Sequence, residues 1–227
     1  MNFKGFLMGI YSFLSLLVVI VCMYLFRSKI FTIRKFWAYS MVKLIGVKIE
    51  EIGALNPDAD VIVLNHNSMF DITLLDHLHP KDIAWVANEK LAKVPVFGWI
   101  FKFPNLILIN PTKRSSLTTL LHRAKQEISA KRPIGIFPEG TRGDNDEIAK
   151  FQVGAKLITE KLHLAVQPIV LIGTRKRLDT KTFISTPGVV KVIYLDTVDS
   201  SQKDWFENME QSVKAIYEAQ TKNLISL

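Results

Sequence analysis

The chain has 227 residues, enough for one domain with a buried core, and it is both apolar and basic. Hydrophobic residues make up 48% of it, the mean hydropathy is +0.19 and the formal net charge is +8. Such a chain favours either nucleic acid or an anionic membrane surface as its partner. The sequence shows no interleaving of aromatic and basic residues in a pattern that reads RNA or DNA, no zinc-ligand spacing and no helix-turn-helix pattern, so we expect a membrane and no nucleic acid. The single cysteine, Cys22, excludes an intrachain disulfide.

The N-terminal segment is predicted to associate with the membrane. Residues Phe6–Phe26 carry no charge, and as a helix they would extend roughly 31 Å, enough to cross a bilayer core. A signal peptide is disfavoured because Arg27-Ser28-Lys29 follows in place of a cleavage site of small residues. The sequence leaves open whether this helix spans the bilayer or dips into one leaflet.

Basic and aromatic residues alternate after this run, between Arg27 and Lys48. This mixture predicts an interfacial helix with apolar side chains in lipid and basic groups on the headgroups. An ordinary amphipathic helix packed on the domain is the alternative. We therefore divide the chain into membrane-anchoring helices over residues 1–48 and an α/β domain over residues 49–227.

The remainder alternates between short β-branched runs and helical stretches. Strands are expected at Val61–Leu64, Asp82–Ala87, Leu106–Ile109, Ile134–Phe137, Val166–Leu171 and Val189–Leu195. Helices are expected at Phe70–Leu78, Ser115–Ala130, Gly154–Leu162 and Ser201–Asn223. This order predicts an α/β fold with a mostly parallel central sheet flanked by helices. Gly140–Glu147 is the segment expected to be a mobile loop.

The first chemical signature is Asn65-His66-Asn67-Ser68-Met69-Phe70-Asp71, which follows the first of these strands. Sites of open α/β sheets lie at the carboxyl ends of the strands. A spacing of five residues lets the Asp71 carboxylate accept a hydrogen bond from one nitrogen of His66, which frees the other to take a proton. The alternative is structural, because Ser68 and Asp71 also fit a helix capping box.

The second signature is Phe137-Pro138-Glu139-Gly140-Thr141-Arg142, which leaves another expected strand. Gly140 lets backbone amides approach a ligand closely. Thr141 adds a hydroxyl, and the planar fork of Arg142 suits a phosphate. In isolation this string is also compatible with a charged surface loop. The two signatures together indicate a base beside an anion site.

These residues resemble the glycerolipid acyltransferase family, specifically the 1-acyl-sn-glycerol-3-phosphate acyltransferases. The family's first block, Asn-His-x-Ser-x-x-Asp, is matched by Asn65, His66, Ser68 and Asp71. Its third block is matched throughout by 137–142, and a fourth block resembles Val166–Val170. The second block departs from the pattern, because Pro111 stands where relatives carry a phosphate-binding arginine. Lys113 and Arg114 follow, either to supply that charge or as solvated residues that open the next helix.

The resemblance implies direct acyl transfer, without an acyl-enzyme, to the sn-2 hydroxyl of lysophosphatidic acid, which gives phosphatidic acid. His66 would be the base and Asp71 would orient it, while Glu139, Gly140, Thr141, Arg142, Lys113 and Arg114 would bind substrate. Acyl-CoA or acyl-carrier protein would be the donor, with no cofactor and no metal. A lysophospholipid acceptor and membrane lipid would be the partners. We expect the enzyme at the inner, cytoplasmic membrane, with its catalytic domain facing the cytoplasm.

Three alternatives remain. The acceptor could be another lysophospholipid. A metal-dependent hydrolase would use His66, Asp71, Asp76, His77 and His79, although their spacing matches no ligand motif. A non-enzymatic lipid-binding module would explain the N-terminus and the charge, but it would leave both signatures as coincidence.

Overall fold

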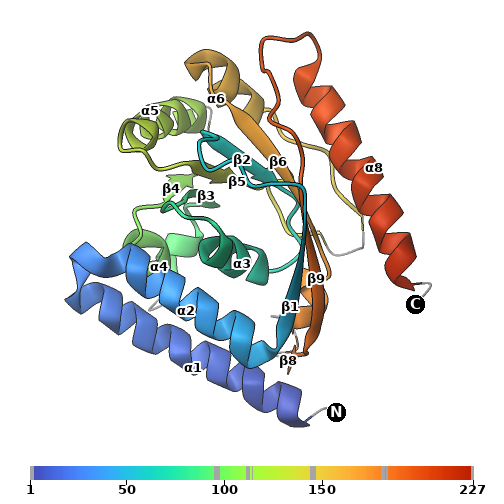
Figure 1. Ribbon diagram of the computed structural model, residues 1–227. Coiled ribbons are helices and arrows are strands. Elements are labelled where there is room, and N and C mark those ends of the chain that lie inside the picture. The colour runs from blue at the N-terminus through green and yellow to red at the C-terminus, as the bar shows by residue number, and fades with distance from the viewer. Residues whose placement is uncertain are drawn as a thin grey trace.

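A seven-stranded sheet forms the centre of the molecule, and helices cover both of its faces (Figure 1). This computed structural model describes residues 3–94, 98–110, 113, 115–143, 147–179, 182 and 184–225. The strand order across the sheet is β1-β9-β6-β2-β5-β3-β4. Strands β6, β2, β5, β3 and β4 are parallel, whereas β9 is antiparallel to β6 and β1 is parallel to β9. The prediction of a mostly parallel sheet flanked by helices is confirmed.

The strands are short and mostly buried, as expected for a sheet covered on both faces. Those of the main sheet are β1 (Val47–Ile52), β2 (Val61–Leu64), β3 (Ala84–Asn88), β4 (Ile107–Ile109), β5 (Ile134–Ile136), β6 (Val166–Ile172) and β9 (Gly188–Tyr194). A separate antiparallel pair consists of β7 (Leu178–Asp179) and β8 (Ile184–Ser185).

Helices connect the strands and form the two outer layers. They are α1 (Phe3–Leu25), α2 (Ile30–Ile45), α3 (Phe70–Leu78), α4 (Gly98–Lys102), α5 (Ser115–Ser129), α6 (Gly154–Leu162), α7 (Thr174–Arg177) and α8 (Trp205–Ile225). Short 3₁₀ helices lie at Arg27–Lys29 and Leu91–Lys93.

The apolar core is divided by the sheet into two layers. On one face, side chains of the central strands pack against α5, α6 and α8, with Leu120, Ile158 and Phe206 among the buried residues. On the other face they pack against α2 and α3, with Val42 and Leu74 buried. Each central strand contributes to both layers because successive side chains of a strand point to opposite faces.

The N-terminal helices α1 and α2 lie side by side against this second layer (Figure 1). Trp37 of α2 donates its indole N–H to Ser15 of α1 at 3.0 Å. The N-terminal part of α1 contacts β8, and near its other end the ring of Tyr24 lies 6.1 Å from that of Phe103. Within the described residues, Gly5–Leu25 is the stretch long and apolar enough to cross a membrane. Both ends of α1 nevertheless contact the domain.

The structure differs from the sequence predictions mainly at element ends. Strand β1 was not predicted, and the expected boundary after residue 48 falls inside it. Helix α8 begins at Trp205 in place of Ser201, because Asp199 accepts hydrogen bonds from the backbone and hydroxyl of Ser201 and holds a turn there. Residues 144–146 of the expected mobile loop lie outside the described residues.

Candidate active site

His66 and Asp71 meet at the carboxyl end of β2, where the chain turns into α3. His66 Nδ1 lies 2.9 Å from Asp71 Oδ2, so the contact predicted from the five-residue spacing is present. A carboxylate can only accept, so Nδ1 carries the proton and Nε2 is the acceptor of the ring. The Asp71 side chain is fully buried, whereas that of His66 is 13% exposed. The ring is therefore fixed on one side and accessible on the other.

The same carboxylate oxygen also holds the turn. Asp71 Oδ2 accepts the backbone N–H groups of Asn67 and Ser68, each at 2.8 Å. Ser68 Oγ in turn accepts the N–H of Phe70 at 3.1 Å. The capping interpretation and the histidine-orienting interpretation of this motif are thus both present in the geometry.

Asn65 fastens this turn to the neighbouring strand. Its fully buried side chain donates to the carbonyl of Leu171 at 2.9 Å and accepts the N–H of the same residue at 2.7 Å. Both groups belong to β6, which pairs with β2. The sequence pattern marked Asn65 but gave no role for it, because its partner lies 106 residues away.

Glu139 joins the two signatures through the backbone. Its Oε1 accepts the N–H of His66 at 2.7 Å, and its Oε2 accepts the N–H of Ala149 at 2.9 Å. Burial raises the pKa of the Glu139 carboxyl, and the two N–H groups oppose that rise. The N–H of Gly143 donates to the carbonyl of His66 at 3.0 Å, which closes a second link. The two loops are therefore one unit.

The remaining residues of the second signature face solvent on this unit. Gly140, Thr141 and Arg142 are exposed, directly after the buried Glu139. Gly140 has a φ of +75°, a conformation that glycine adopts without strain. Arg142 precedes Gly143, whose N–H bonds the His66 carbonyl. A cationic fork thus lies on the loop that touches the histidine backbone.

Lys113 lies farther along the same edge of the sheet. Its Nζ is 4.0 Å from Glu89 Oε1, which also accepts the amide N–H of Asn110 at 2.9 Å. Strands β5 and β3 separate β4 from β2, so the ends of β2 and β4 lie roughly 14 Å apart at ordinary strand spacing. The structure pairs Lys113 with Glu89. Arg114 and Pro111 lie outside the described residues.

Aromatic rings stack on the face of His66. The Phe137 ring lies 3.8 Å from the imidazole between centroids, at an interplanar angle of 20°. Trp85 lies behind Phe137 at 5.2 Å and 8°. No local spacing in the sequence links Trp85 to His66, because the three rings meet only through the place of β5 between β2 and β3 in the sheet.

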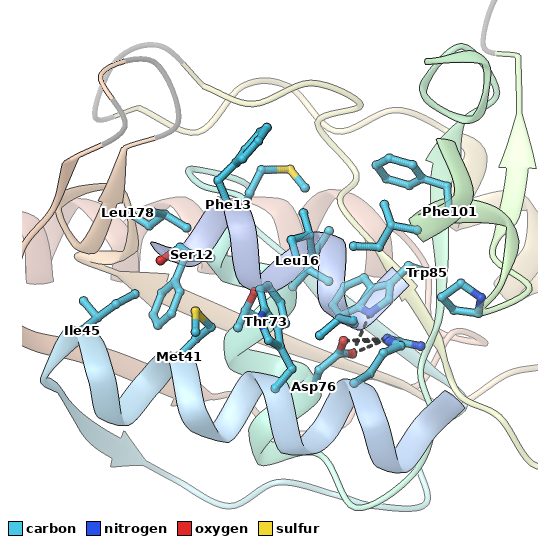
Figure 2. A pocket seen from close by; sticks show the side chains of 18 of the residues that line it. Ser12, Phe13, Leu16, Met41, Ile45, Thr73, Asp76, Trp85, Phe101 and Leu178 are labelled. Carbon is cyan, nitrogen blue, oxygen red and sulfur yellow. Dashed lines mark hydrogen bonds and ion pairs between the residues drawn. The ribbon is translucent and has the colours of Figure 1, made fainter. Parts of the chain in front are cut away.

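An apolar cavity of about 200 Å³ lies beside this stack, between the N-terminal helices and the domain (Figure 2). Trp85, Met69 and Phe70 line it on the side of the active-site turn, and Phe13, Leu16 and Met41 line it from α1 and α2. Its mostly apolar walls are suited to an aliphatic chain.

A buried ion pair forms a polar part of the cavity wall. Arg34 of α2 donates through Nε to Asp76 Oδ2 at 3.1 Å and through Nη2 to both carboxylate oxygens (Figure 2). The indole N–H of Trp85 donates to Asp76 Oδ1 at 3.1 Å. A second carboxylate, Asp82, bonds Arg34 Nη1 at 3.0 Å. The pair thus ties the N-terminal helices to the domain.

The five residues of the hydrolase alternative do not form one cluster, although His66 and Asp71 are in contact. Asp76 is engaged by Arg34 and Trp85, and the His79 ring bonds the backbone of Lys81. Among the residues that the structure describes, no group of three His, Cys, Asp or Glu side chains is arranged to hold a metal ion.

Comparison with known proteins places this geometry in a family. Residues 47–172 match the model of the family described as Acyltransferase. A protein of Helicobacter pylori (strain J99) named 1-acyl-sn-glycerol-3-phosphate acyltransferase is 36% identical over 177 residues, which cover 77% of this chain and 75% of that protein. The matched region contains both signatures.

Two further relatives extend the comparison. The chloroplastic 1-acyl-sn-glycerol-3-phosphate acyltransferase LPAT1 of Arabidopsis thaliana is 29% identical over 185 residues, which cover 79% of this chain but about half (51%) of that protein. The crystal structure of the 1-acyl-sn-glycerophosphate acyltransferase PlsC from Thermotoga maritima shares the fold. Its TM-score is 0.71 at 23% identity, and 96% of each chain is covered.

Proposed function

The chain belongs to the acyltransferase family, as an enzyme of the 1-acyl-sn-glycerol-3-phosphate acyltransferase type, and on this premise we propose a specific reaction. A fatty acyl group passes from an acyl thioester to the sn-2 hydroxyl of lysophosphatidic acid, and phosphatidic acid is formed. The observation that carries the proposal is the His66–Asp71 pair, with Nδ1 held at 2.9 Å from a buried carboxylate and Nε2 left to accept a proton.

His66 acts as the general base in this reaction. Its Nε2 takes the proton of the sn-2 hydroxyl as that oxygen forms a bond to the thioester carbonyl carbon. Collapse of the tetrahedral intermediate breaks the carbon–sulfur bond, and the leaving thiolate takes the proton from the imidazolium. Asp71 keeps Nδ1 as the donor nitrogen and stabilises the transient cation. Atoms and charge balance without an acyl-enzyme.

The acceptor phosphate binds on the second signature. Arg142 offers a bidentate fork, Thr141 a hydroxyl and Gly140 a backbone that a phosphate can approach closely. Both Glu139 oxygens already accept backbone N–H groups, so we assign Glu139 to ordering this loop against His66. Lys113 lies toward Glu89, and we assign it, with Arg114, to attracting the anionic substrates along the sheet edge.

The acyl chain occupies the cavity beside Trp85. Met69 and Phe70 line the cavity and directly follow the turn that holds His66. When the thioester carbonyl lies near His66, only a short part of the acyl chain is therefore needed to reach the apolar cavity. The donor thiol is carried by coenzyme A or by acyl-carrier protein, and the basic surface attracts either acidic carrier.

The outward face of the N-terminal helices lies in lipid. Leu14, Val18 and Leu25 of α1 and Phe36 of α2 are each more than half exposed, which is unusual for large apolar side chains in water. Because both ends of α1 contact the domain, we propose that α1 is immersed along one leaflet and does not cross the bilayer. The leaflet is the cytoplasmic one of the inner membrane, where the thioester donors are found.

The test is release of free thiol by purified, detergent-solubilised protein that is given acyl-CoA, with and without lysophosphatidic acid. We expect release that requires the acceptor and that is lost in His66→Ala. His122→Ala is the matched control, because His122 is exposed on α5 and its ring lies against the side chain of its neighbour Gln126, away from the two signatures. Arg142→Ala should raise the KM for lysophosphatidic acid with little change in the KM for the donor.

Three outcomes would change the proposal. Full activity of His66→Ala would show that His66 is not the general base. Release with a lysophospholipid that carries another headgroup, but not with lysophosphatidic acid, would replace the acceptor. Release with acyl-carrier protein alone would fix the donor as the protein-bound thioester.

A further inference from the structure

The side chain of His66 is held by more than its hydrogen bond to Asp71. A ring fixed at Cβ and at one nitrogen can still swing about the line that joins these two points. The Phe137 ring lies on one face of the imidazole at 3.8 Å, and it blocks the swing toward that side. For the direction of Nε2, this contact matters as much as the hydrogen bond.

Phe137 alone is a weak support, since it is only half-buried. The Trp85 ring stacks on Phe137 with the centroids 5.2 Å apart and an interplanar angle of 8°, and Trp85 is 1% exposed. The Trp85 indole N–H donates to Asp76 Oδ1 at 3.1 Å. The two carboxylate oxygens of Asp76 are held by Arg34 of α2. His66, Phe137, Trp85, Asp76 and Arg34 thus form a column in which each residue directly contacts the next.

The space for Trp85 depends on a residue without a side chain. Gly135 of β5 lies under the indole, and a Cβ at this position would come within 2.5 Å of Trp85 Cε3 and 2.7 Å of Ile83 Cγ2. Only glycine allows this close approach of a strand to the ring. The backbone of β5 and the column are therefore fitted to each other.

We infer that Phe137 and Trp85 are positioning residues for His66, and that Asp76 of α3 anchors them and is itself held by Arg34 of the N-terminal helix pair. The inference rests on the proposed role of His66 as the base. Aromatic rings suit this task better than aliphatic side chains, because the imidazole becomes a cation when it takes the hydroxyl proton, and an aromatic face attracts a cation. The column thus acts on the chemical step.

The test compares Phe137→Leu with Phe206→Leu in the full-length protein. Phe206 is 3% exposed, lies on α8 in the other core layer and packs against Trp205 and Phe151, so its substitution removes a similar ring far from His66. We expect Phe137→Leu to lower kcat roughly ten- to hundredfold, as a small misplacement of a catalytic group does. The KM for lysophosphatidic acid should change by less than about twofold.

Phe206→Leu should lower the unfolding temperature at least as much and leave kcat near that of the wild type. Phe137→Tyr, which keeps the ring face, should restore most of kcat. A second series keeps the inference falsifiable if Phe137→Leu does not fold: kcat should fall in the order wild type, Trp85→Phe, Trp85→Leu. In Trp85→Phe a phenyl ring still stacks on Phe137, but the hydrogen bond from the indole N–H to Asp76 is lost.

The column has no such role if Phe137→Leu retains kcat within about twofold of the wild type, or if Phe206→Leu loses as much. An equal kcat for Trp85→Phe and Trp85→Leu would also overturn the inference. His66→Ala separates this failure from failure of the proposed function. An inactive His66→Ala beside a fully active Phe137→Leu contradicts only the column, whereas an active His66→Ala contradicts both.

Discussion

At the scale of single residues, the active site depends on groups that each do two things. Asp71 Oδ2 accepts three hydrogen bonds, one from the His66 ring and two from the backbone of the turn that carries it. Glu139 uses one oxygen for the His66 N–H and the other for the loop that carries Arg142. A substitution at either residue therefore changes the backbone and the chemistry together, and only replacements of the same shape separate them.

Asp71→Asn is expected to lower kcat about 10²–10⁴-fold, the range for loss of a positioned acid–base group. An amide oxygen can accept the same three bonds, but it carries no charge to stabilise the imidazolium. The amide NH₂ would occupy the place of Oδ1, which is buried and has no hydrogen-bond partner. The measurement is steady-state kinetics together with the unfolding midpoint. Asp199→Asn, at an exposed turn, is the control, and a kcat near the wild-type value in Asp71→Asn would refute the assigned role.

His79 makes the stability of the protein depend on pH. Burial lowers the pKa of its ring, with help from Lys81 and Lys35, while Asp76 and a backbone bond oppose the shift. The unfolded ring takes up its proton near pH 6.5, and the folded ring takes it up only at lower pH. In between, the unfolded chain binds more protons, so stability falls as pH falls below 6.5, by at most about 1.4 kcal/mol per pH unit.

The check is the unfolding midpoint measured from pH 7.5 downward in His79→Asn. The asparagine oxygen can still accept the N–H of Lys81 that the ring nitrogen accepts at 3.1 Å. We expect a shallower loss of stability on acidification than in the wild type. His122→Asn, at an exposed position, should keep the wild-type slope. Identical slopes in His79→Asn and the wild type would show that this ring does not set the pH dependence.

At the scale of secondary structure, local pattern predicted the elements that the chain forms by itself. The bounds of β2, α3 and α6 were predicted to the residue, because each is a clear apolar run or an amphipathic stretch between breakers. Strand β1 was missed because the adjacent Glu50 and Glu51 break the alternation of apolar and charged residues in Val47–Ile52, and the strand pairs with β9 at the edge of the sheet. Its partner lies about 140 residues away, and no local signal announces it.

In the candidate site, too, contacts within one turn could be predicted from local sequence, whereas contacts between strands could not. The His66–Asp71 contact could be predicted because both residues lie within one turn. The clamp from Asn65 to Leu171 and the stack of Trp85 behind Phe137 depend on strand order, which the sequence pattern alone does not fix. The sequence left Lys113 open between a phosphate-binding role and a solvated position, and its approach to Glu89 at 4.0 Å depends on the place of β4 in the sheet.

Gly135→Ala tests how closely strand β5 is fitted to Trp85. The added methyl would overlap the indole, so we expect the protein to lose about 1–3 kcal/mol of stability, as overpacked cores do. Because the indole backs Phe137, kcat should fall as well. Gly154→Ala is the matched control: its Cβ would meet Leu120 Cδ2 at an ordinary 3.7 Å at the start of α6. The measurements are thermal unfolding and steady-state kinetics of both variants. Equal stabilities of Gly135→Ala and Gly154→Ala would contradict the expected overlap.

At the scale of the whole molecule, the N-terminal helices line the apolar cavity and also present an exposed apolar surface. Phe13 and Leu16 of α1 line the cavity from one side, while Leu14 and Val18 are exposed on the helix. An acyl chain bound there would lie between the domain and the lipid-facing helix. Sequence alone left open whether α1 spans the bilayer, because length and hydropathy are the same for both arrangements. The contacts at both ends of α1 are the basis of the proposal that it lies along one leaflet.

Cysteine labelling in lipid vesicles tests this placement. In a Cys22→Ala background, which removes the single native thiol, cysteines are introduced at Val18, at Phe36 and at Lys203. Val18 and Phe36 are 63% and 72% exposed on α1 and α2, and Lys203 is exposed in the turn before α8. Since a thiol within the hydrocarbon is shielded from a water-soluble maleimide, Val18→Cys and Phe36→Cys should react much more slowly than Lys203→Cys until the protein is unfolded. Equal rates at all three positions would place the helices in water, whereas protection at Val18 alone would indicate that α1 leaves α2 and crosses the bilayer.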